Sequence, residues 1–147
     1  MRSATGRVGG FFLAISIILF SLIVDRLGRA SSVDPSLYDG LAGNVAALRL
    51  LAPGRERATM ERLASLGTSA GWEPTPSVKA ESHGPVTDVI FGSAGVVLAA
   101  AWAGGETAAA IMTMGGEAIL RVAEPTEAGL DWRMWPGYRS SNPNFSH

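Results

Sequence analysis

The sequence predicts an all-α protein built from paired helices and preceded by a hydrophobic N-terminal helix. Three observations lead to this class. An uncharged run of seventeen residues, 8–24, lies near the start of the chain. The motif Gly-x-Ala-Gly occurs at Gly40 and again at Gly92, 52 residues later, each time at the head of an apolar run. A segment with apolar residues at helical spacing follows each run, so we divide the chain into a hydrophobic segment, 1–30, and one domain, 31–147.

The hydrophobic segment has the features of a membrane anchor. The run 8–24 reaches the roughly 17–25 residues that a membrane-crossing helix needs, and arginines flank it on both sides. We therefore expect a signal-anchor helix that holds the protein at a membrane. Gly28-Arg29-Ala30 also places small residues where a signal peptidase cleaves, so a cleaved signal peptide is an alternative. Burial of this segment in a cytoplasmic protein is another.

The first helical pair is expected over 36–52 and 54–67. In the first segment Leu41, Val45 and Leu48 recur at helical spacing, which is typical of a buried helix. Glycine costs up to about 1 kcal/mol in a helix interior, so paired glycines near a helix start indicate close approach to a neighbour or a ligand. The second segment is amphipathic and is expected to be half-exposed.

The second pair repeats this order, with a buried helix over 88–103 and an amphipathic one over 105–124. Two connections rich in Pro and Gly, 72–87 and 125–145, each come before the point where a buried helix begins or would begin. A series of helical pairs with both long loops on one side would present a functional face there.

Charge and cysteine content exclude several functions. The formal net charge is -1, and the single lysine, Lys79, accompanies eleven arginines, so we expect no nucleic-acid partner. The 147 residues contain no cysteine. This excludes a disulfide framework, a cysteine-based zinc site and a thiol nucleophile within these residues.

Three motifs carry a resemblance to a known family: SVDPSLYDGLAG (32–43), TDVIFGSAG (87–95) and NFSH (144–147). In this order they resemble successive inner-helix entries of the lanthionine synthetase cyclases, the LanC-like proteins, in which the last motif continues as His-Gly-x-x-Gly. The resemblance covers about 32–147. It implies an incomplete α/α toroid, with an inner and an outer ring of helices, of which this chain supplies two helical pairs and the approach to a third.

The resemblance also implies a reaction, the addition of a cysteine thiol to a dehydroalanine or dehydrobutyrine, which closes a lanthionine ring in a peptide. The implied partner is a peptide that carries both groups. Family enzymes bind zinc through two cysteines and a histidine late in the chain, where zinc deprotonates the thiol. Because this chain has no cysteine, we expect it to bind no metal or other cofactor and, as a fragment, to be inactive.

Two catalytic candidates are carried over from the family. His147 occupies the histidine of the His-Gly motif, for which the resemblance implies acid/base chemistry, and an unperturbed pKa near 6.5 suits that task. Asp88 matches the aspartate that opens the second inner-helix motif and is implied to orient or share that proton. The alternatives are that Asp88 only caps the helix and that His147 only forms a hydrogen bond.

A candidate substrate-binding rim lies in GLDWRMWPGYR (129–139), where Trp132 and Trp135 alternate with Arg133. These side chains could bind a peptide by stacking and cation–π contact. They could instead cover the edge of the helical ring.

A function from another class remains open, a membrane-anchored helical-repeat binding module without chemistry. A toroid that acts on carbohydrate would need paired carboxylates, and Asp88, Glu106 and Glu117 show no convincing pairing.

Overall fold

A computed structural model describes residues 5–28, 32–79, 82 and 84–138. Over these residues the elements are α1 (Thr5–Gly28), α2 (Leu41–Leu51), α3 (Arg57–Leu66), α4 (Pro76–Lys79), α5 (Ser93–Ala103), α6 (Glu106–Arg121), β1 (Glu124–Thr126) and β2 (Gly129–Asp131). The predicted predominance of helix is confirmed. The two short strands, which the sequence did not predict, pair antiparallel just after α6, with Pro125 opposite Leu130.

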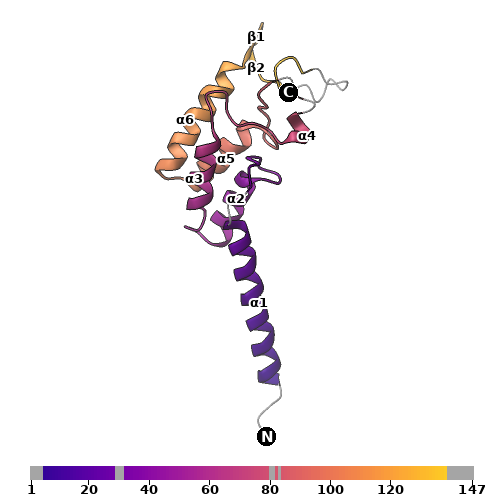
Figure 1. Ribbon diagram of the computed structural model, residues 1–147, viewed down its shortest axis with the longest axis vertical. Coiled ribbons are helices and arrows are strands. Elements are labelled where there is room, and N and C mark those ends of the chain that lie inside the picture. The colour runs from indigo at the N-terminus through magenta and orange to yellow at the C-terminus, as the bar shows by residue number, and fades with distance from the viewer. Residues whose placement is uncertain (1–4, 29–31, 80–81, 83, 139–147) are drawn as a thin grey trace.

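Helix α1 contains the predicted hydrophobic run and projects away from the other helices (Figure 1). Its last turns contact α2, where Val24 is buried and Asp25 Oδ1 accepts a hydrogen bond from Arg55 Nη2 at 2.7 Å. Six apolar side chains before this contact are between 44% and 59% exposed: Ile17, Ile18, Leu19, Phe20, Leu22 and Ile23.

Within the described part of the chain, no helix combines the length and the apolar character that a membrane crossing requires.

The other long helices form two antiparallel pairs that lie side by side. Helix α2 pairs with α3 and α5 with α6, while α2 also packs against α5 and α3 against α6 (Figure 1). This gives two layers, α2 and α5 in one and α3 and α6 in the other. The turns between the partners depend on glycine, because Gly54, Gly104 and Gly105 have φ of 92°, 74° and 89°, where other residues are strained.

The core lies between the two layers. Leu41, Val45 and Leu48 are fully buried, which confirms their predicted position on the inner face of α2. Trp72, predicted to lie in a loop, is also part of the core, and its Nε1 donates to Leu63 O at 2.8 Å. Because the indole N–H has this partner, the ring can be buried without an unsatisfied donor.

The predicted 52-residue repeat is present in the backbone. We call residues 34–40 the first entry loop and residues 86–92 the second, since each leads into a buried helix. Corresponding amides close the two loops with corresponding bonds: Leu41 N to Asp34 O at 2.8 Å and Ser93 N to Val86 O at 3.0 Å, then Ala42 N to Pro35 O at 3.3 Å and Ala94 N to Thr87 O at 3.2 Å. The predicted helices at 36 and 88 therefore begin about one turn later, at Leu41 and Ser93.

The glycine before each helix has the same steric reason in both loops. A Cβ on Gly40 would lie 2.5 to 2.8 Å from backbone atoms of Asp34 and Ser36. A Cβ on Gly92 would lie 2.6 to 2.7 Å from backbone atoms of Val86 and Asp88, which stand 52 residues later. The prediction of close backbone approach is therefore confirmed at both positions.

The two entry loops also bind each other directly. Leu37 N and Tyr38 N of the first loop both donate to Ile90 O of the second, at 3.1 and 3.2 Å. The Tyr38 and Phe91 rings meet edge to face with their centroids 6.1 Å apart. The loops thus form one continuous surface at the N-terminal ends of α2 and α5.

Candidate functional site at the entry of α5

Asp88 organises the second entry loop. Its Oδ1 accepts hydrogen bonds from Ile90 N at 2.7 Å and Phe91 N at 3.0 Å. In the first loop the equivalent residue is Ser36, whose Oγ accepts one bond from Asp39 N at 3.3 Å. A carboxylate thus holds the second loop with two bonds where a hydroxyl holds the first with one.

The other carboxylate oxygen of Asp88 is buried and has no hydrogen-bond partner among the residues that the structure describes. Leaving a buried polar atom unpaired costs about 1–3 kcal/mol, so a hydrogen-bond donor brought to this oxygen would be favourable. Thr59 Oγ1 is a second atom of this kind within the described residues. An oxygen in this state can accept a hydrogen bond. The second catalytic candidate, His147, lies outside the described residues.

The predicted substrate-binding rim lies next to Asp88, because Thr87 connects the two. Thr87 N donates to Met134 O at 2.9 Å, and Thr87 Oγ1 donates to Arg133 O. The second entry loop is therefore joined to residues 132–138, which we call the C-terminal loop.

The three rim candidates are half-buried and take part in the internal contacts of the C-terminal loop. Trp132 Nε1 donates to Ile119 O at 2.9 Å, which ties the loop to the end of α6. The Trp135 and Tyr138 rings meet edge to face with centroids 4.5 Å apart. These contacts fix the indole groups at the loop end of the helical pairs, while their role toward a substrate stays a prediction.

Arg133 is held by two carboxylates. Its Nε lies 2.8 Å from Glu124 Oε2, and its Nη2 lies 3.6 Å from Asp131 Oδ2. Gly137 N donates to the second oxygen of Glu124 at 3.2 Å. These interactions lower the pKa of Glu124 below its ordinary value. The hydrogen bond from the Gly137 amide has the largest effect, and the Arg133 guanidinium has the next largest. Arg133 is thus the centre of a charged cluster that links the β1–β2 hairpin to the C-terminal loop.

The residues of this chain do not fit the zinc site that the LanC-like resemblance implies. The described part of the chain contains no cluster of three or more His, Cys, Asp or Glu side chains that could hold a metal ion. The full 147 residues supply no cysteine. No reaction step is therefore assigned to a metal in this chain.

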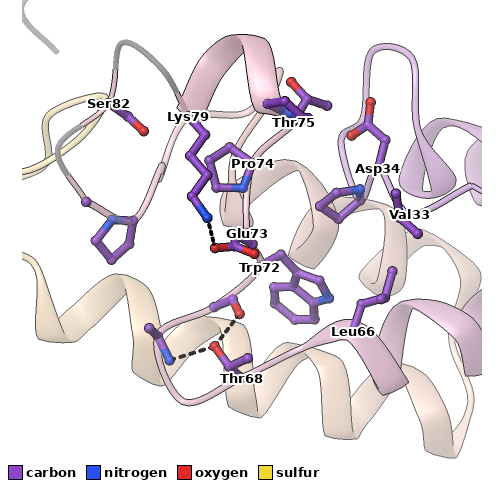
Figure 2. A pocket seen from close by; sticks show the side chains of 16 residues that line it. Val33, Asp34, Leu66, Thr68, Trp72, Glu73, Pro74, Thr75, Lys79 and Ser82 are labelled. Carbon is purple, nitrogen blue, oxygen red and sulfur yellow. Dashed lines mark hydrogen bonds and ion pairs between the residues drawn. The ribbon is translucent and has the colours of Figure 1, made fainter.

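A pocket opens at the same loop end of the helical pairs. No single sequence motif predicted it. Its volume is about 780 Å³, and it lies between the first entry loop, the end of α3 and the segment from Thr68 to Pro85 (Figure 2). The predicted functional face of the Pro/Gly-rich connection 72–87 was the only sequence signal for it. The pocket draws on segments about 50 residues apart, so local patterns could not define it.

The chain matches no protein-family model, no curated protein and no solved structure. The likeness to LanC-like proteins therefore rests on the three sequence motifs.

Proposed function

We propose that this chain is the N-terminal portion of a LanC-like protein that adds a thiol to a dehydroamino acid in a peptide. The observation that carries the proposal is the state of Asp88. One oxygen is fixed by two backbone amides, and the other is buried and unpaired within the described residues. An oriented carboxylate with a spare oxygen suits a residue that positions a proton donor, and it stands where the family motif has its aspartate.

The difference in burial between repeated positions supports the proposal of a ring. Leu37 packs against the core and Ala46 is half-buried, whereas their counterparts Val89 and Leu98 are 49% and 54% exposed. The second helical pair covers the face of the first pair on which Leu37 and Ala46 lie. The equivalent face of the second pair is not covered by the described residues. A third pair in the same register would cover Val89 and Leu98, and continued addition with a constant rotation leads to a closed α/α toroid.

In the proposed reaction a thiolate attacks the β-carbon of the dehydroamino acid and forms a carbon–sulfur bond. The electron pair of the carbon–carbon double bond moves to the α-carbon and its carbonyl group as an enolate. A general acid then delivers a proton to the α-carbon. We assign this proton to His147 and propose that Asp88 orients or shares it, as the family resemblance implies.

The reading frame beyond the codon for His147 is the first test. The proposal requires Gly-x-x-Gly directly after His147 and two cysteines and a histidine further on. A frame without these residues would refute the enzyme function for this chain.

The second test uses the polypeptide from the whole reading frame and a dehydrated peptide with one free cysteine. Thiol alkylation and mass spectrometry measure the rate of ring closure across a range of pH. Asp88→Asn keeps the Oδ1 acceptor for the two loop amides and removes the charge, so we expect ring closure to slow by about 10²-fold or more with little change in thermal stability. Asp39→Asn, at an exposed residue of the first entry loop, is the matched control. Equal rates and pH profiles for the two variants would refute the role of Asp88.

A binding module without chemistry is the second candidate, and the pocket at the loop end favours it. Peptide binding without ring closure by the whole polypeptide would identify this function.

A further inference from the structure

We propose that the pocket beside Trp72 binds a peptide segment in which a basic side chain stands next to apolar ones. The proposal does not depend on thiol addition, because it rests on the walls of the pocket alone. Its volume of about 780 Å³ falls within the roughly 300–1,000 Å³ that is usual for ligand sites. Figure 2 shows Leu66 and Val33 on one side of the Trp72 indole, where they add apolar surface.

Many backbone amides of the pocket wall are missing or already used as donors. Four of its residues have no backbone N–H because they are prolines: Pro35, Pro74, Pro76 and Pro85. Several other amides of the wall are already used inside the protein: Ala70 N donates to Thr68 Oγ1, Gly71 N to Thr68 O, Trp72 N to Ser93 Oγ and Lys79 N to Thr75 O. A ligand that brings its own donors, as peptide N–H groups and a basic side chain do, therefore matches this part of the wall.

The charge of the wall favours a cation. Among the described lining residues, the carboxylates of Asp34 and Glu73 stand against the single ammonium group of Lys79. Lys79 Nζ already forms an ion pair with Glu73 Oε1. Asp34 Oδ1 accepts one bond, from Ser36 N at 2.8 Å, and a carboxylate has about four acceptor sites. The uncompensated negative charge is thus near Asp34, where a guanidinium group would find a planar acceptor.

The apolar part of the wall selects the neighbours of that cation. The rings of Pro74, Pro76 and Pro85, together with Val33 and Leu66, provide a surface on which aliphatic side chains lose contact with water. A free cation would gain nothing from this surface. A short peptide with a basic residue between two apolar residues matches both features of the wall.

In the test a peptide probe is titrated into the isotopically labelled full chain. The NMR shifts of the backbone amides report binding. The probe is acetyl-Leu-Arg-Leu-amide, compared with acetyl-Leu-Glu-Leu-amide and argininamide. We expect saturable shifts at Gly71 and Glu73 with the first probe only. Asp34→Asn keeps the acceptor for Ser36 N, and Glu73→Gln is a change at an exposed site, so both variants should fold. Each should raise the Kd about two- to fivefold.

Two further variants complete the design. Ala70→Phe fills the pocket from an exposed position and should abolish binding, and Glu127→Gln, outside the pocket on an exposed turn, should leave the Kd unchanged. Equal binding of the Glu peptide, shifts that lie away from the pocket, or binding that survives Ala70→Phe would overturn the proposal. Equal affinity for argininamide would overturn the peptide assignment in favour of a small cation.

Discussion

The two glycines Gly95 and Gly116 allow a sharp test of how the repeat is packed. Both are inside helices, α5 and α6. A Cβ on Gly95 would lie 2.0 Å from Val89 O and 2.9 Å from Leu37 Cβ, whereas a Cβ on Gly116 would meet nothing within 4 Å. Replacement by alanine gives each helix the same gain of about 0.5–1 kcal/mol, because alanine has the better helix propensity.

The two substitutions should therefore change stability in opposite directions. Gly116→Ala should stabilise the protein by that gain. In Gly95→Ala the second entry loop must move away, and the overlap is with a backbone carbonyl rather than with a flexible side chain. Overpacking of this kind costs about 1–3 kcal/mol or more, so we expect a net loss of about 2 kcal/mol in the free energy of unfolding.

Urea unfolding, monitored by circular dichroism, measures both changes, and a loss of this size should lower the Tm by roughly 10 °C. Gly43→Ala is a second check, since its Cβ would lie 2.4 Å from Leu37 O, the equivalent contact in the first unit. If Gly95→Ala were as stable as Gly116→Ala, the close approach of loop and helix would be wrong.

Three other predictions concern the C-terminal loop and the anchor. Because the pKa of Glu124 is lowered in the folded protein, its ionised form stabilises the fold above the ordinary pKa of 4.5, and this contribution disappears as the pH falls through the lowered value. Glu124→Gln should therefore reduce the decrease in Tm on acidification; an unchanged acid profile would contradict this. Trp132→Phe removes the hydrogen bond to Ile119 O and should cost about 0.5–1.5 kcal/mol in urea unfolding, while Trp102→Phe, at an exposed side chain, should stay within about 0.5 kcal/mol. Lipid attachment through 8–24 stays a prediction: in a flotation assay with phosphatidylcholine vesicles the chain should rise with the lipid, and a chain left at the bottom would argue against it.

The helical pairs were predictable because their signals are local. The amphipathic segments expected over 54–67 and 105–124 are observed as Arg57–Leu66 and Glu106–Arg121, within three residues at each end. The starts of the buried helices were less accurate, since the turns that precede Leu41 and Ser93 are held by side chains and by the neighbouring loop. Periodicity carries no information about such contacts.

The candidate site could be predicted only in part. The family resemblance singled out Asp88, but its unpaired buried oxygen depends on the folded loop. Trp72 was assigned to a connection because Pro and Gly follow and precede it, yet its ring fills space between α3 and α6 next to Gly67 and Gly115. Burial of this kind is set by residues distant in the chain, which a linear pattern does not contain.

The carbonyl oxygen of Ile90 accepts hydrogen bonds from two amides of the first entry loop. This has a consequence for how the sequences of such repeats can differ. The junction between the two units uses main-chain atoms, which every residue except proline can provide. These two hydrogen bonds therefore put no demand on side-chain identity, and the Tyr38–Phe91 ring pair is a separate contact beside them. This accounts for the difference between Ser-Leu-Tyr-Asp-Gly and Asp-Val-Ile-Phe-Gly, which share only the final residue. One unit can thus have a carboxylate at this position while the other has a hydroxyl, and the main-chain hydrogen bonds between the two units do not depend on that difference.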